Sequence, residues 1–169
     1  MHDDSDVLDL SWNPKMAGRP LPNPRDSARA DESEDESCPA FGFLRGLRDR
    51  SLMLEFRLKN GNTEAFSYHL LSSIRYNPSV GLLLKFSGDV VTLVLIHGSN
   101  LDFVLKDRAV NLTDRGIYRH RVTFVREMNE TELSRAGANQ PTIDHILLKE
   151  LDSIDEQTEW IQKTAPVFL

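Results

Sequence analysis

Arginine is the residue type whose number and spacing in this sequence point to a chemistry. A guanidinium group pairs with phosphate through two parallel hydrogen bonds and also stacks on nucleobases. Seven arginines fall into two groups in the central part of the chain: Arg45, Arg48 and Arg50, and then Arg115, Arg119, Arg121 and Arg126. We expect Arg48, Arg50, Arg115, Arg119, Arg121 and Arg126 to form a nucleic-acid-binding strip on a sheet, flanked by Tyr76, Tyr118 or Phe124.

The orientation of these arginines depends on the strand expected at Ile117–Arg126, where apolar and polar residues alternate. The residues expected on its inner face are Tyr118, His120, Val122 and Phe124. The residues expected to point outward are Arg119, Arg121 and Thr123. A competing interpretation is that these arginines are only the solvated face of an ordinary strand.

Signatures of catalysis are scarce. The sequence contains no G-x-S-x-G elbow, no G-x-x-x-x-G-K phosphate loop and no G-x-G-x-x-G dinucleotide loop. The histidines share no close spacing with one another or with the single cysteine, Cys38, so we expect no metal site and no cofactor. A catalytic arrangement assembled in space stays open, and it would place Asp89, Asp102 or Asp114 beside His97 or His120.

Charge divides the chain into three segments. Residues 1–40 carry ten acidic and four basic side chains, residues 41–128 carry eight and thirteen, and residues 129–169 carry eight and three. The segment charges are therefore −6, +5 and −5, so a pI of about 5.3 conceals a basic centre. Because residues 1–40 hold few large apolar side chains, we expect them to be a disordered acidic segment.

The acidic run Asp31–Ser37 suggests a role for this segment. Like charges tethered beside a basic domain could occupy its arginine face and compete with an external polyanion. The simpler alternative is a tail that only increases solubility.

Alternation of apolar and polar residues between Leu52 and Ile96 predicts an antiparallel β-meander. Strands are expected at Leu52–Lys59, Thr63–Leu71, Ser73–Tyr76, Leu82–Phe86 and Val90–Ile96. Asn60-Gly61 favours a two-residue hairpin turn, and Asn77–Gly81 favours a second turn. The nearly continuous apolar run of Val90–Ile96 predicts a strand that is covered on both faces.

The rest of the chain predicts short helices and one ambiguous segment. Ser99 or Asn100 could cap a short helix, and Asn129–Ala136 predicts a helical turn or two before a linker. Thr142–Leu151 fits a helix or a strand that closes the sheet, and we favour the helix. The expected fold is mainly β with minor α. It is a small antiparallel meander or partly closed barrel over residues 41–128, followed by a linker and a C-terminal helix in residues 129–169, which are partly disordered.

The stretch Leu95–Leu101 resembles the second motif of Sm-like RNA-binding barrels, in which a strand ends in an isoleucine, a basic residue and a glycine. His97 stands where that family prefers arginine, and Tyr76–Ser79 stands in place of its Asp and Asn pair. The resemblance covers about a dozen of the 169 residues, so no binding residue of that family is carried over.

These features favour an intracellular, non-catalytic binding module whose arginine face takes a polyanion: nucleic acid first, or an acidic protein. The alternative is an adaptor that adds a peptide strand at an exposed sheet edge, either Ser67–Leu71 or Ile117–Val125, or a small domain without small-molecule chemistry. The sequence shows no signal peptide and no apolar run near the ~20 residues of a membrane helix, so we expect a cytoplasmic location and no membrane contact.

Overall fold

The computed structural model describes residues 35–169, and these residues form two β-sheets. The strands of the first sheet are β1 (Asp35–Ser37), β2 (Phe41–Leu44), β3 (Met53–Arg57), β4 (Thr63–Ser67) and β8 (Val122–Arg126). The strands of the second sheet are β5 (Leu71–Asn77), β6 (Gly81–Ser87), β7 (Val91–Ser99) and β9 (Thr142–Leu151). The α-helices in this part of the chain are α2 (Glu130–Arg135) and α3 (Ile154–Thr164).

The first sheet has the strand order β1-β2-β8-β3-β4, and the second has the order β5-β6-β7-β9. Neighbouring strands are antiparallel except β3 and β8, which run parallel with Glu55 opposite Phe124. Within the described residues the sheets do not close into a barrel. The expectation of a mainly β fold with short helices is therefore confirmed.

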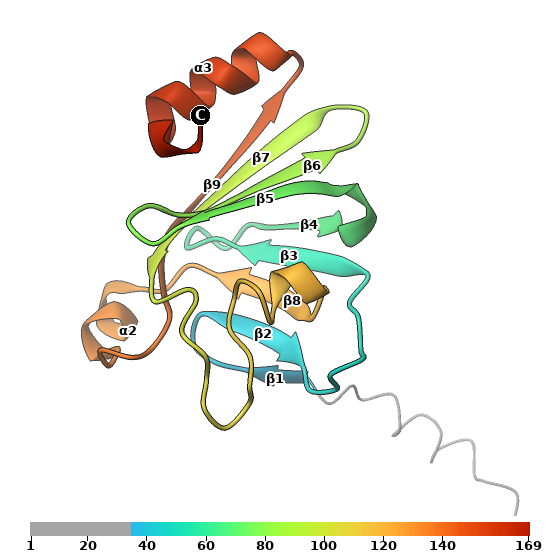
Figure 1. Ribbon diagram of the computed structural model, residues 1–169. Helices are drawn as coiled ribbons and strands as arrows, with labels where there is room; N and C mark the ends of the chain where they lie inside the picture. Colours follow the sequence, from blue (N-terminus) through green and yellow to red (C-terminus); the bar gives the residue numbers. More distant parts are fainter. Residues whose placement is uncertain (1–34) are drawn as a thin grey trace, which may run out of the picture. The chain divides into compact units, whose positions relative to one another are not determined.

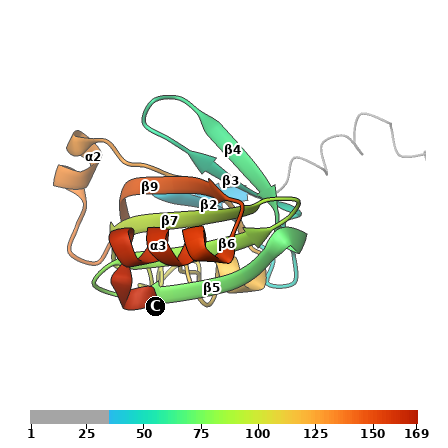
Figure 2. The ribbon, with the colours of Figure 1, turned by 90° about the horizontal axis from the view of Figure 1, so that it is seen from above.

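The second sheet lies between the first sheet and helix α3 (Figure 1). One face of β7 contributes Val94 and Ile96 to the core between the sheets, together with residues such as Phe41 and Phe56. The other face contributes Leu93 and Leu95 to a smaller cluster beneath α3. Seen from above, α3 lies over this sheet and runs roughly along its strands (Figure 2). The prediction that both faces of this strand are covered is confirmed.

The β3–β4 hairpin forms where Asn60-Gly61 predicted it, but with a longer loop. The Leu58 amide donates to the Asn62 carbonyl, and the Gly61 amide donates to the Leu58 carbonyl. Gly61 has a φ of 88°, the left-handed conformation that glycine tolerates best. This is the three-residue loop in which a turn is followed by a left-handed residue, so the predicted two-residue turn is wrong.

Two helix predictions are wrong. Thr142–Leu151 is strand β9, which pairs with β7 along its whole length, as the strand alternative required. Its side chains alternate over a buried sheet, and this pairing outweighs its helical spacing. The segment after Ser99 and Asn100 forms turns and an isolated bridge between Leu105 and Val110 instead of a capped helix.

The β structure also extends beyond the expected domain limits of residues 41–128. Strand β1 precedes them and β9 follows them. Residues 1–34 of the segment predicted to be disordered lie outside the described residues. Most of the acidic run lies there as well. Helix α2 confirms the helical turns expected at Asn129–Ala136, and Asn129 caps it by accepting from the Glu132 amide.

The expectation that Ile117–Val125 offers a free sheet edge is wrong. Within it, β8 is an interior strand that pairs with β2 on one side and with β3 on the other. The other candidate edge, Ser67–Leu71, is mostly not a strand. Ser67 is the last residue of the edge strand β4, and Tyr68–Leu70 forms a short 3-10 helix. Over residues 35–169, no helix has the length and apolar character needed to cross a membrane.

Candidate nucleic-acid interface

Two loops that carry arginines run side by side at one end of the first sheet. The β2–β3 loop spans residues 45–52, and the segment before β8 spans residues 111–121. The Leu44 amide donates to the Arg121 carbonyl at 2.8 Å, and the Ser51 amide donates to the His120 carbonyl at 2.7 Å. These bonds bring together the two arginine groups that lie far apart in the sequence. In Figure 1 the β2–β3 loop is the connection on the right, beside the coil that precedes β8.

Arg121 holds the two loops together from inside the protein. Its side chain is 1% exposed, and one terminal nitrogen, Nη2, donates to the carbonyls of Leu44 at 3.0 Å and Arg45 at 3.3 Å. The other, Nη1, donates to the Arg115 carbonyl at 3.4 Å. Burial, together with repulsion from Arg119 and Arg50, lowers the pKa of Arg121 below its usual value. The prediction that Arg121 points outward is therefore wrong, because the side chain lies beneath the loops.

The local backbone explains this reversal. Ile117–Arg119 forms a 3-10 helix instead of the start of a strand, and His120 ends it with a φ of 55°. Tyr118 points outward from this 3-10 helix, and the left-handed His120 is followed by Arg121, which points inward. Gly116 is required because a Cβ there would lie 2.2 Å from the Asn111 carbonyl oxygen. Sequence alternation alone does not show such a turn.

A buried asparagine shapes the loop that carries Arg115. Asn111 is 2% exposed, and its amide nitrogen donates to the Asp102 carbonyl and to the Asp114 carboxylate. Its side-chain oxygen accepts from the Arg115 amide at 2.9 Å. The Asn111 side chain thus supplies hydrogen bonds that backbone groups would supply in regular structure. These bonds hold the backbone of Arg115 in place.

The surface of the two loops is rich in guanidinium groups. We call it the arginine cluster; its exposed members are Arg45, Arg48, Arg50, Arg115 and Arg119. The acidic side chains on the same loops are Asp49 and Asp114, so positive charge predominates. Within residues 35–169, none of Arg48, Arg115 and Arg119 forms an ion pair with a carboxylate. These three guanidinium groups can therefore accept an anion without first losing a partner.

Aromatic side chains lie within the cluster. Tyr118 is 46% exposed and stands between Arg115 and Arg119 in the sequence, as a base-stacking residue would require. The His120 ring stacks on the Tyr68 ring with 4.4 Å between centroids. Burial, with Arg50 and His69 nearby, lowers the pKa of His120, so its ring adds little positive charge at neutral pH.

Comparison with models of known protein families, with curated proteins and with solved structures finds no match. The geometry of the chain's own residues is therefore the basis for assigning a function.

Arg126 is not part of this cluster. It is the last residue of β8, about 13 Å along the strand from its first residue if each residue adds about 3.3 Å. Its guanidinium forms two hydrogen bonds with Glu132, at 2.8 and 3.1 Å, and a third with the Pro39 carbonyl. Arg126 lowers the pKa of Glu132 in this pair. It therefore joins β8 to α2 and to the start of β2.

The catalytic arrangement of an aspartate beside His97 or His120 does not form in the described part of the chain. There, His97 contacts the Val80 carbonyl, His120 stacks on Tyr68, and neither histidine pairs with an aspartate. Over residues 35–169, no group of three or more metal-ligating side chains comes together.

Proposed function

We propose that this chain is a binding module for nucleic acid, and that the arginine cluster is its contact surface. The observation that supports this most strongly is the placement of Arg121. A buried guanidinium group that bonds to carbonyls of both loops fixes two exposed arginine groups on one surface. A rigid array of this kind loses less entropy when it binds phosphates than separate flexible loops would.

Single strands suit this surface better than a duplex. Tyr118 offers a ring on which an unpaired base can stack, while the surrounding guanidinium groups follow the phosphates. Reading a duplex in its major groove usually requires an exposed basic helix or ribbon. Helix α3 instead carries Asp155, Glu156 and Glu159, whose charges phosphates repel.

Salt dependence is the first test of this proposal. We expect full-length protein to bind a labelled single-stranded oligonucleotide of about 16 nucleotides, measured by fluorescence anisotropy. If three to five phosphates are contacted, the slope of log K against log salt should be about −2 to −3.5 between about 50 and 200 mM salt.

Two outcomes of this titration would contradict the proposal. One is no binding at about 50 mM salt, where phosphate contacts are strongest. The other is binding that salt does not change, because this is the behaviour expected of a peptide strand added to a sheet edge through backbone hydrogen bonds. The role of the acidic run as a competitor remains a prediction, since most of it lies outside the described residues.

A further inference from the structure

A cavity of about 240 Å³ lies between the second sheet and helix α3. The register of the sheet determines its floor. Ser73 pairs with Lys85, which pairs with Leu93, and in the next row Arg75 pairs with Leu83. These five side chains alternate along their strands onto the face that α3 covers, so three strands supply one continuous floor.

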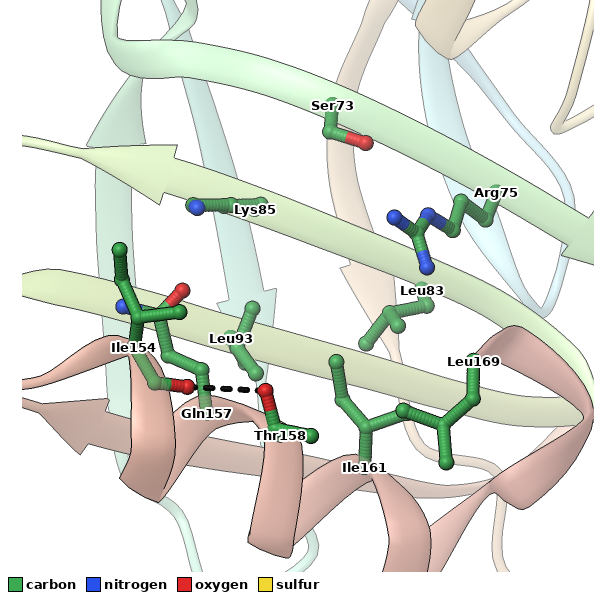
Figure 3. A pocket seen from close by; sticks show the side chains of 10 residues that line it. All are labelled: Ser73, Arg75, Leu83, Lys85, Leu93, Ile154, Gln157, Thr158, Ile161 and Leu169. Carbon is green, nitrogen blue, oxygen red and sulfur yellow. Dashed lines mark hydrogen bonds between the residues drawn. The ribbon is translucent and has the colours of Figure 1, made fainter.

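The helix and the residues after it supply the rest of the wall. Ile161 and Leu169 face Leu83 across the cavity, and Ile154 stands at the other end (Figure 3). Ile154 is 77% exposed and Leu169 is 64% exposed, although both are large apolar residues. Helix α3 thus contributes apolar side chains at both ends of the cavity, which reaches solvent past uncovered apolar side chains.

Polar groups gather on one side of this cavity. Arg75 and Lys85 extend from β5 and β6, with the Ser73 hydroxyl beside them (Figure 3). Arg75 donates through Nη1 to the Phe168 carbonyl, which orients the guanidinium and leaves its other N–H groups available. None of the ten lining side chains is acidic, and within residues 35–169 Lys85 has no ion-pair partner. The polar side therefore favours an anion.

Gln157 gives an independent indication of a ligand. Its side chain lines the cavity and the residue is only 8% exposed, but its amide forms no hydrogen bond with another described residue. The amide therefore faces the open cavity, since Arg121 Nε is the fully buried side-chain atom without a partner in residues 35–169. A bound carboxylate would accept from the Gln157 amide.

We propose that this cavity binds a small amphipathic carboxylate, with its alkyl chain along Leu83, Leu93 and Ile161. The carboxylate lies on the side of Lys85 and Arg75, within reach of Gln157. The volume is below the ~300 Å³ at which pockets for drug-sized ligands begin, so a short chain fits better than a long one. This site is separate from the arginine cluster and does not depend on the proposed binding of nucleic acid.

Calorimetric titration of the full-length protein with sodium octanoate tests this proposal. We expect saturable binding at a single site, and at least tenfold weaker binding of octanol, which has the same chain without the charge. The variant Lys85→Met should bind octanoate at least tenfold more weakly, because it keeps the length of the side chain and loses its charge.

Lys149→Met is the matched control. Lys149 pairs with Leu93 in the sheet register but does not line this cavity, so octanoate affinity should stay within twofold. Thermal unfolding of both variants checks that they fold. The proposal is wrong if octanoate does not bind at millimolar concentration, if octanol binds equally well, or if both lysine variants weaken binding to the same extent.

Discussion

The substitution Glu127→Ala is expected to lower the free energy of unfolding by about 2 to 4 kcal/mol. Glu127 follows β8, and its side chain is 4% exposed. One carboxylate oxygen, Oε1, accepts from the Ile146 amide at 2.7 Å and from His145 Nδ1 at 2.8 Å. The other, Oε2, accepts from the Lys59 amide at 2.6 Å. Alanine would leave two backbone N–H groups without this acceptor.

This carboxylate connects the two sheets. Lys59 follows β3 in the first sheet, whereas His145 and Ile146 belong to β9 in the second. Both β3 and β9 lack a complete backbone partner at this point, and the side chain of Glu127 supplies the missing acceptors. Loss of the carboxylate should therefore loosen the packing of β9, in addition to removing the hydrogen bonds themselves.

The same site predicts how stability depends on pH. Burial alone would raise the pKa of Glu127, but hydrogen bonds from the Lys59 and Ile146 amides and from His145 outweigh it and hold the pKa below its usual value. The pKa of Glu127 in the unfolded chain is about 4.3. Because the folded value is lower, this stabilisation is present above the unfolded pKa and is lost as pH falls through the folded pKa.

Urea denaturation between about pH 3 and 7 would measure both effects. Glu127→Gln should fall between wild type and Glu127→Ala, since its amide oxygen can accept from one N–H group but not from both. Glu150→Ala, at an exposed position of β9, is the control and should change stability by less than about 0.5 kcal/mol. An equal effect of Glu127→Ala and Glu150→Ala would show that the buried carboxylate does not connect the sheets.

The substitution Arg121→Ala should be similarly destabilising, by about 2 to 4 kcal/mol, because it removes a large buried side chain and three hydrogen bonds to carbonyls. We also expect Arg121→Ala to weaken the binding of oligonucleotide. Without the guanidinium, the loop of Arg45 and the loop of Arg115 are no longer tied to each other, so the arginine cluster loses its fixed geometry.

Arg121→Met separates these contributions, since methionine restores most of the volume without any hydrogen-bond donor. We expect Arg121→Met to be more stable than Arg121→Ala, but to bind oligonucleotide as weakly as Arg121→Ala does. Both variants also remove the buried Nε, which has no hydrogen-bond partner in the wild type and therefore carries a desolvation cost there. Thermal unfolding together with anisotropy at one salt concentration would show both trends. Wild-type affinity in Arg121→Met would mean that Arg121 does not organise the surface.

The sequence patterns predicted the strands well where side chains alternate over a buried sheet. Leu54 and Phe56 lie in the core as expected, whereas Leu52 is 73% exposed because β3 starts only at Met53. The pattern failed at Ile117–Arg126, because a left-handed residue at His120 changes the direction of the side chains that follow.

Long-range pairing explains the remaining differences. Thr142–Leu151 has apolar residues at both helical and strand spacing, and the free edge of β7 decides between them. The structure places Arg48 and Arg50 on one loop, and Arg115 and Arg119 on the segment that is hydrogen-bonded to that loop. It assigns Arg121 to the interior, and it assigns Arg126 to a pair with Glu132. The role of Glu127 depends on partners far away in the sequence, and that of Gln157 depends on a cavity whose floor comes from other strands, so no local signal shows either role.

Comparison of two variants with equal charge tests the arginine cluster most directly. Arg48→Ala/Arg115→Ala/Arg119→Ala removes three positive charges from the cluster. The control variant, Arg135→Ala/Lys149→Ala/Lys163→Ala, removes three exposed positive charges elsewhere. In oligonucleotide anisotropy at about 50 mM salt, we predict a loss of affinity of about 30-fold or more for the cluster variant, with a salt slope shallower by about 2. The control should lose less than about threefold. Equal losses in the two variants would contradict a specific site, because overall charge would then explain the binding.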